Sequence, residues 1–163
     1  MTLSIQPVTK ENWRALIALN VAQEQSHFVA SNLYSIAESQ FGADEADGSH
    51  WDLEPYGIFD GETPVGFLMY GYNFHYPQYQ AFILRLMVDE KCQGKGYGRF
   101  GMQKMLEVFR ADERILSVGI SYEPSNEAAR KLYASLGFVE SGRILDGEAE
   151  AICKIRWQKL VVE

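Results

Sequence analysis

Hydrophobic positions along the chain repeat with two different periods, and this predicts alternating strands and helices. Residues 4–8 alternate between apolar and polar side chains, as in a strand, whereas Trp13, Leu16 and Ile17 share one face of a helix. A second helix is predicted around residues 32–41. The polar, acidic stretch that follows, residues 42–48, is predicted to be a loop.

Apolar runs dominate the middle of the chain and predict neighbouring strands. Residues 56–59 and 65–70 flank Asp60-Gly61, a dipeptide typical of hairpin turns. Residues 73–80 are aromatic and polar, and are expected to connect this hairpin to the next strand. The run 82–88 is apolar apart from Arg85, which is typical of a buried central strand.

The last third returns to the helical period and then to strands. After a glycine-rich turn, residues 102–109 carry apolar side chains at helical spacing, and residues 115–120 read as a strand. Ser125 is expected to cap another helix that Gly137 ends. Two final strands are expected over residues 138–144 and 149–157. The pattern predicts a mixed α/β fold in one domain, residues 1–163, with a central mixed sheet of about six to seven strands flanked by about four helices.

Composition narrows the class of partner. The 163 residues are 47% hydrophobic and carry a net charge of −7, which argues against nucleic acid as a partner because phosphate backbones need basic surfaces. No apolar run is long enough to cross a membrane, and the N-terminus lacks the layout of a signal peptide. Cys92 and Cys153 lie far apart, and no Cys/His spacing predicts a metal site. A cytoplasmic protein without metal is expected.

The most informative stretch is Gln93-Gly94-Lys95-Gly96-Tyr97-Gly98, between the predicted strand 82–88 and a helix that begins near Arg99. A strand, a glycine-rich turn and a helix N-terminus together present backbone N–H groups to an anion. The Gly-x-x-x-x-Gly-Lys-Ser/Thr pattern of a P-loop is absent, and the glycine spacing differs from that of a dinucleotide fingerprint. The stretch therefore indicates a different phosphate site, with a purely structural turn as the alternative.

Two motifs together resemble one enzyme family. Gln93-x-x-Gly96-x-Gly98 and Asn126-x-x-Ala129-x-x-Leu132-Tyr133-x-x-x-Gly137-Phe138 resemble the GNAT family of acyl-CoA-dependent N-acetyltransferases, in the right order over the C-terminal two thirds. The match looks closer to bacterial spermine/spermidine acetyltransferases at residues 65–71, Arg85, residues 88–98 and Gly147-Glu148. The N-terminal third, which usually shapes the acceptor site, resembles them more loosely.

The resemblance implies acetyl-CoA as cosubstrate. The strand before the turn would splay from its neighbour and bond the pantetheine arm, and the turn with the following helix start would hold the pyrophosphate. Tyr133 would be the catalytic acid that gives its proton to the CoA sulfur, with packing on the apolar face of its helix as the alternative. The residues implied to contact the cosubstrate are Leu86, Met87, Val88, Gln93, Gly94, Lys95, Gly96, Tyr97, Gly98, Arg99 and Asn126.

The acceptor is expected to be a primary amine, with a polyamine favoured by the acidic charge and the resemblance. An aminoglycoside, a protein amino group, a non-catalytic acyl-CoA sensor and a purely structural domain are alternatives. A homodimer is a further possibility, supported by the apolar last strand with Trp157. The general base is sought among Glu24, Glu38, Glu54 and Asp89. The residues expected near the acceptor are Glu24, Tyr34, Glu38, Glu54, His75 and Arg85, with an aromatic wall of Tyr34, Tyr56, Tyr70, Tyr72, Phe74, His75 and Tyr76 that is alternatively core.

Overall fold

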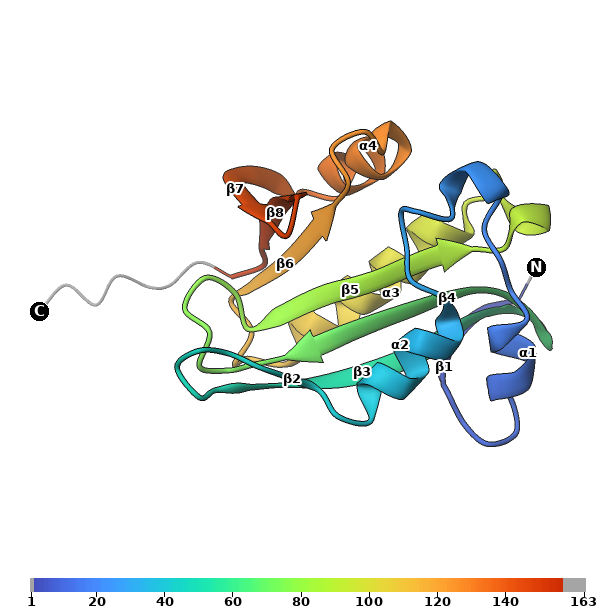
Figure 1. Ribbon diagram of the computed structural model, residues 1–163, viewed down its shortest axis with the longest axis horizontal. Helices are drawn as coiled ribbons and strands as arrows, with labels where there is room; N and C mark the ends of the chain where they lie inside the picture. Colours follow the sequence, from blue (N-terminus) through green and yellow to red (C-terminus); the bar gives the residue numbers. More distant parts are fainter. Residues whose placement is uncertain (1, 157–163) are drawn as a thin grey trace, which may run out of the picture.

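The computed structural model describes residues 2–156, in which strands and helices alternate along the chain (Figure 1). Four α-helices and two single-turn 3₁₀ helices accompany the strands of this described part. The elements in chain order are β1 (Leu3–Pro7), α1 (Trp13–Ile17), η1 (Gln23–Gln25), α2 (Asn32–Ser39), β2 (Ala43–Asp44), β3 (His50–Asp60), β4 (Thr63–Tyr72), β5 (Ala81–Val88), η2 (Glu90–Cys92), α3 (Tyr97–Ala111), β6 (Ser117–Tyr122), α4 (Glu127–Ser135), β7 (Val139–Leu145) and β8 (Glu148–Lys154).

One mixed sheet organises the molecule. Its strand order is β1-β3-β4-β5-β6-β8-β7, with the short β2 paired to β3 outside this path. The β5–β6 pair is parallel and the other pairs are antiparallel. Helices α1 and α2 lie over one face of the sheet, and α3 lies behind the other (Figure 1). The predicted mixed α/β architecture is thus confirmed.

Apolar side chains fill both faces of the sheet. On the α3 face, Met102, Met105 and Phe109 are completely buried against strand residues such as Leu68 and Ile83. These helical residues are spaced three or four positions apart, so they form one stripe that faces the sheet. On the opposite face a second cluster, Trp51, Leu53, Phe67, Met69, Tyr79 and Met87, packs under the N-terminal helices.

Strand β5 has a neighbour on both sides only over its first half. Its parallel pairing with β6 ends at Ile83↔Ile120, whereas its pairing with β4 continues to Gly66↔Val88. Figure 1 shows β6 diverging from β5 towards α4. Because the second half of β5 lacks this partner, its backbone groups on the β6 side are available for other hydrogen bonds.

Several boundaries differ from the predicted ones. Strand β3 begins at His50, six residues earlier than residue 56. Trp51 and Leu53 do alternate with exposed residues there. The Pro55 carbonyl faces β1 and accepts a hydrogen bond from Val8 N at 3.1 Å, just beyond the last β1–β3 pair, Pro7↔Tyr56. An N–H group at this position would point to the same side and would have no strand partner there, so proline is tolerated.

Two further differences concern a loop and a helix cap. The predicted loop 42–48 contains the two residues of β2. Helix α4 is capped by Asn126, whose side chain accepts a hydrogen bond from Ala129 N at 3.2 Å, and not by Ser125. Strand β8 ends at Lys154, and Trp157 lies outside the described residues. The homodimer expected in part from Trp157 therefore stays a prediction.

Candidate functional site

A cavity of about 530 Å³ opens where β5 and β6 diverge. The second half of β5 forms one wall, and the end of β6 with helix α4 forms the other. The segment around η1 and the end of the glycine turn complete the lining. The lining residues are Val21, Gln25, His27, Phe28, Val29, Ala30, Ile83, Leu84, Arg85, Leu86, Met87, Val88, Gln93, Gly98, Ile120, Ser121, Tyr122, Asn126, Ala128, Ala129, Leu132, Tyr133 and Glu148. The three strand residues predicted to contact the cosubstrate, together with Gln93, Gly98, Asn126 and Tyr133, are therefore brought together.

The glycine-rich turn has the backbone conformation that its sequence predicts. Gly94 and Gly96 have φ angles of 77° and 85°, in the left-handed region that glycine adopts readily. Gly96 is the N-cap of α3, so the first N–H groups of this helix have no partner within the helix. A turn of this kind at a helix N-terminus can bind an anion through backbone N–H groups.

Gln93 fixes the turn to two other segments. Its amide donates to the carbonyl oxygen of Val88 at 3.1 Å and to the side-chain oxygen of Gln25 at 2.8 Å. The first bond closes the loop between β5 and α3, and the second ties this loop to η1. The Gln93 side chain therefore shapes the cavity wall, and it lies at the cavity edge as well.

Tyr97 and Arg99, which were predicted to contact the cosubstrate, use their side chains for contacts within the fold. The Tyr97 hydroxyl donates to Asp60 Oδ2 at 2.8 Å and its ring is buried, so only the backbone of Tyr97 belongs to the turn surface. Arg99 Nη2 donates to Ser135 Oγ at 2.9 Å and so links α3 to α4. Lys95 is exposed beside Gly94 and Gly96.

Tyr133 lies at the junction of core and cavity. Its side chain is 8% exposed, and its ring is 5.6 Å from that of Tyr122 and 6.1 Å from that of Phe138. Burial raises the pKa of the Tyr133 phenol above its usual value, and the negative charge of Glu148 and the neighbouring Tyr122 raise it further. The phenol is therefore protonated at neutral pH and can serve as a proton donor, while its ring packs in the core.

The predicted acceptor residues do not form one cluster. Arg85 lines the cavity and pairs with Glu38 of α2 through a 3.1 Å contact between Nη2 and Oε2. This is the carboxylate partner that a charge within an apolar strand requires. Glu54 lies elsewhere, where it accepts hydrogen bonds from Tyr70 at 2.9 Å and Tyr56 at 3.2 Å. Of the predicted acceptor residues, only Arg85 therefore lines the cavity, and Glu38 pairs with it from outside the lining.

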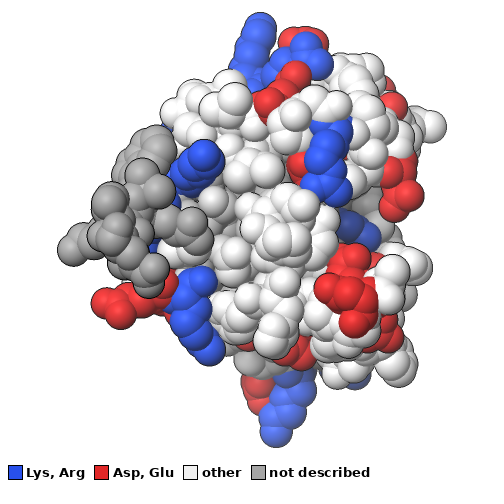
Figure 2. Space-filling view, turned by 90° about the vertical axis from the view of Figure 1, so that its left-hand side faces the viewer, with Lys and Arg blue, Asp and Glu red and all other residues white. Residues whose placement is uncertain are grey.

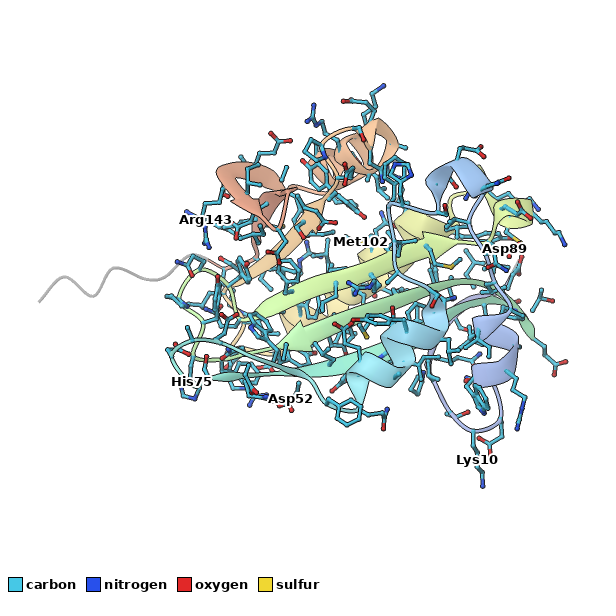
Figure 3. The ribbon with its side chains drawn as sticks, in the orientation of Figure 1. Lys10, Asp52, His75, Asp89, Met102 and Arg143 are labelled. Atoms are coloured by element: carbon cyan, nitrogen blue, oxygen red, sulfur yellow. The ribbon has the colours of Figure 1, made fainter. Side chains whose placement is uncertain are left out.

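The remaining members of that set lie away from the cavity lining. Glu24 is exposed on η1, and Tyr34 is 60% exposed on α2. Figure 3 shows His75 at the opposite end of the sheet from Asp89, which follows the last residue of β5. Asp89 itself accepts backbone bonds from Asn20 and Lys91, both at 3.1 Å, and so has a structural role in the turn.

The aromatic wall expected at the acceptor is divided between interior and surface: Tyr70 is buried, Tyr56, Tyr72 and Tyr76 are half-buried, and Tyr34, Phe74 and His75 are exposed. Tyr70 is 2% exposed and its ring lies 5.1 Å from both Tyr72 and Phe109. Tyr76 packs on Trp51 with ring centroids 5.4 Å apart. The alternative interpretation, a core residue, therefore describes Tyr70, and none of the seven lines the cavity.

Glu148 is a cavity residue that was not among the candidate bases predicted from the sequence. It begins β8, lines the cavity with Tyr133, and its Oε2 accepts a hydrogen bond from Ser121 Oγ at 2.5 Å. The only signal in the sequence was the Gly147-Glu148 pair, which was part of the resemblance to spermine/spermidine acetyltransferases and was not considered as a candidate base. Its position depends on the β6–β8 pairing, which residue spacing alone does not predict.

Two kinds of structural feature are absent from the described residues, 2–156. No group of three or more His, Cys, Asp or Glu side chains there is arranged to hold a metal ion. None of the helices in the same range has the length and apolar character needed to span a bilayer.

Comparisons with known proteins agree with this geometry. The profile of the acetyltransferase (GNAT) family matches residues 13–138. The chain is 26% identical over 151 residues to the spermine/spermidine N(1)-acetyltransferase of Bacillus subtilis (strain 168), covering 88% of this chain and 92% of that protein.

Solved structures share the fold at lower identity. The aminoglycoside acetyltransferase AAC(6')-Ib in complex with coenzyme A has a TM-score of 0.71 at 17% identity, over 94% of this chain and 95% of that one. The spermidine N-acetyltransferase from Vibrio cholerae in complex with CoA and spermine has a TM-score of 0.66 at 15% identity, over 92% of each chain. Since the family profile spans most of the sequence, the chain belongs to the acetyltransferase (GNAT) family.

Proposed function

We propose that this domain transfers the acetyl group of acetyl-CoA to a primary amine by direct attack, and that the amine belongs to a polyamine. One observation carries the proposal: the open edge of β5, the glycine turn and the Tyr133 phenol all border a single cavity. Each of these three features suits a different part of an acyl-CoA thioester.

The fit to the CoA moiety follows from the backbone. Beyond Ile83 the β6 side of β5 is unpaired, so the amide groups of the pantetheine arm can bond Leu86, Met87 and Val88 in the manner of an added strand. The pyrophosphate would then lie on the N–H groups of residues 94–99 at the start of α3. Glycines with positive φ at positions 94 and 96 leave this surface without side-chain atoms that would hold a phosphate away.

The chemical step needs a proton donor at the thiolate. The amine nitrogen attacks the thioester carbonyl, a C–N bond forms, and the C–S bond breaks. Tyr133 gives its phenolic proton to the departing sulfur, a role supported by its protonated state and its place on the cavity wall. A phenolate left in a buried position would be unstable, so it would be reprotonated as the new amide nitrogen loses a proton.

The acceptor class is supported by the charge of the chain and by the names of its relatives. The chain has a net charge of −7, which favours polycations near its surface. The Bacillus subtilis relative is named for spermine and spermidine, and the Vibrio cholerae structure contains spermine. Aminoglycosides are the second acceptor class to be tested, because one protein with the same fold is named an aminoglycoside acetyltransferase.

The test measures thiol release from acetyl-CoA with spermine, spermidine, an aminoglycoside and an N-terminal peptide amine. We expect turnover with the polyamines. Tyr133→Phe should reduce kcat by about 10²- to 10⁴-fold, the usual contribution of a general acid, and should leave CoA affinity within about twofold of wild type. The phenyl ring keeps the contacts with Tyr122 and Phe138, so the variant is expected to fold.

Four results would contradict parts or all of this proposal. Turnover with the aminoglycoside and with no polyamine would make aminoglycosides, and not polyamines, the acceptor class. Undiminished kcat in Tyr133→Phe would remove the assigned acid. CoA binding without acetylation of any amine would make the protein a sensor, and absence of any thermal stabilisation by CoA would overturn the proposal altogether, because a ligand that binds only the native state must stabilise it.

A further inference from the structure

A single carboxylate faces the cavity next to Tyr133. Among the described lining residues, Glu148 is the only aspartate or glutamate. It lies at the first position of β8, beside the end of β6 that diverges from β5. Resting on the proposed function, we infer that Glu148 binds the ammonium of the reacting amine and accepts a proton from it, and that Ser121 positions this carboxylate.

Ser121 holds one oxygen of the carboxylate in place. The Ser121 hydroxyl donates to Glu148 Oε2 at 2.5 Å, within the range of a charge-assisted bond from a hydroxyl. A carboxylate offers about four lone-pair sites, so this bond leaves acceptor capacity for an ammonium group. Both residues are half-buried on adjacent strands, which restricts the directions in which the carboxylate can point.

The other charged and titratable groups of the cavity leave this role to Glu148. Arg85 is the one arginine in the lining, and its guanidinium already pairs with Glu38 at 3.1 Å. His27 is exposed at the outer segment, and Tyr122 donates its hydroxyl to Glu140 at 2.6 Å. The lining thus combines an arginine, neutralised by Glu38 from outside the lining, with one negative side chain, which suits a cationic acceptor.

Binding of the two substrates drives the proton transfer. Filling the cavity with the thioester and the amine excludes water, and exclusion of water raises the free energy of an ammonium–carboxylate pair relative to the neutral amine and carboxylic acid. The first ammonium proton passes to Glu148 and from there to solvent. The second is lost by nitrogen as the C–N bond forms, and it replaces the proton that Tyr133 gives to sulfur. One proton is released for each acetamide formed.

The test compares Glu148→Gln with a matched control, Glu62→Gln, in the exposed turn between β3 and β4. For Glu148→Gln we expect kcat/KM for the amine to fall by about 10- to 100-fold, the range for loss of a hydrogen bond to a charged group. CoA affinity should stay within about twofold, because the glycine turn and β5 are unchanged. The control should behave as wild type. Calorimetry of spermine binding to the CoA complex, in which no transfer occurs, measures the amine affinity separately.

The outcomes separate this inference from the proposed function. If Glu148→Gln turns over as fast as wild type, the role of Glu148 is overturned and the proposed acetyl transfer stands. Binding of spermine that needs Glu148, in a wild-type protein without turnover, would support the carboxylate as the ammonium site and overturn acetyl transfer. Absence of spermine binding to the wild-type CoA complex would overturn both.

Ser121 provides a second, independent measurement. Ser121→Ala removes the bond to Glu148 but keeps the carboxylate, so KM for the amine should rise by about 3- to 10-fold with CoA affinity unchanged. Ser121→Thr restores a hydroxyl at the same position and should recover most of the loss. A serine with only a packing role would give no such recovery.

Discussion

At the scale of single residues, one buried charge lies next to the site and belongs to the fold. Glu150 of β8 is completely buried. Its Oε1 accepts a bond from the Tyr79 hydroxyl at 2.9 Å and lies 3.4 Å from Arg143 Nη1, and its Oε2 accepts from Ser141 Oγ at 2.5 Å. Burial and the adjacent carboxylate raise the pKa of Tyr79, so this phenol stays protonated and donates a hydrogen bond. Buried carboxylates are tolerated only with partners of this kind.

We therefore expect Tyr79→Phe to destabilise the protein by about 1.5–3 kcal/mol, the contribution of a hydrogen bond to a charged group. Tyr76→Phe is the matched control, because the Tyr76 hydroxyl accepts a long hydrogen bond, 3.5 Å, from the half-exposed Arg143. Urea unfolding of both variants measures the difference in free energy of unfolding. A Tyr79→Phe variant as stable as the control would show that Ser141 and Arg143 alone satisfy Glu150.

Individual site residues differed in how far the sequence could predict them. Tyr133 was found through a motif whose spacing keeps it on one helix. The need of Arg85 for a carboxylate followed from its place in an apolar strand, but choosing Glu38 required the packing of α2 on the sheet. Glu148 escaped because its approach to Tyr133 depends on strands that meet only in the folded sheet. Local rules identify residues, whereas strand pairing decides which of them meet.

At the scale of elements, the divergence of β5 and β6 creates the site. The apolar period predicted both strands, but their parallel pairing stops after Ile83↔Ile120, and this limit was expected only from the family resemblance. Helix α3 was predicted well because its apolar face repeats regularly. Helices α1 and α2 lie where they were expected, but α2 buries Asn32 and Ser35, whereas Leu33 is 54% exposed. The first half of β3 was missed because its alternation includes charged residues and Pro55. Regular amphipathic elements are therefore more predictable than the irregular ones around them.

The glycine turn permits a matched test at this scale. Gly96 has a φ angle of 85° and no atom within 4 Å of an added Cβ, so Gly96→Ala introduces backbone strain of about 1–2 kcal/mol without a collision. We expect lower stability by that amount and a CoA dissociation constant raised by about tenfold, because relief of the strain turns the N–H groups away from the phosphate.

Gly98→Ala adds the same methyl group two residues later, without strain. Its Cβ would lie 3.6 Å from Val88 Cγ2 and 3.9 Å from Leu132 Cδ2, which are ordinary contacts, and alanine favours the helix. This variant should keep wild-type stability, and because Gly98 lines the cavity, any loss of CoA affinity in it measures added bulk and not backbone strain. Equal loss of CoA binding in both variants would mean that bulk near the turn, and not its backbone conformation, governs affinity.

At the scale of the whole molecule, charge acts on the two substrates in opposite directions. The chain has 22 acidic and 15 basic residues besides its three histidines. On the end formed by the β4–β5 connection and the β7–β8 hairpin, charges of both signs surround an uncharged centre (Figure 2). For the proposed substrates, the excess negative charge should attract a polycationic amine and oppose an anionic thioester, which the backbone N–H groups of the glycine turn would hold.

Salt should therefore separate the two substrates. Raising the ionic strength from about 0.01 M to about 0.15 M shortens the Debye length from about 30 Å to about 8 Å. We expect kcat/KM for spermine to fall several-fold over this range, because spermine carries several positive charges. The value for butylamine, with one charge, should fall much less, and KM for acetyl-CoA should not rise. Parallel salt dependences for spermine and butylamine would show that the field of the whole protein contributes nothing to acceptor choice, and that only contacts inside the cavity, such as Glu148, select the amine.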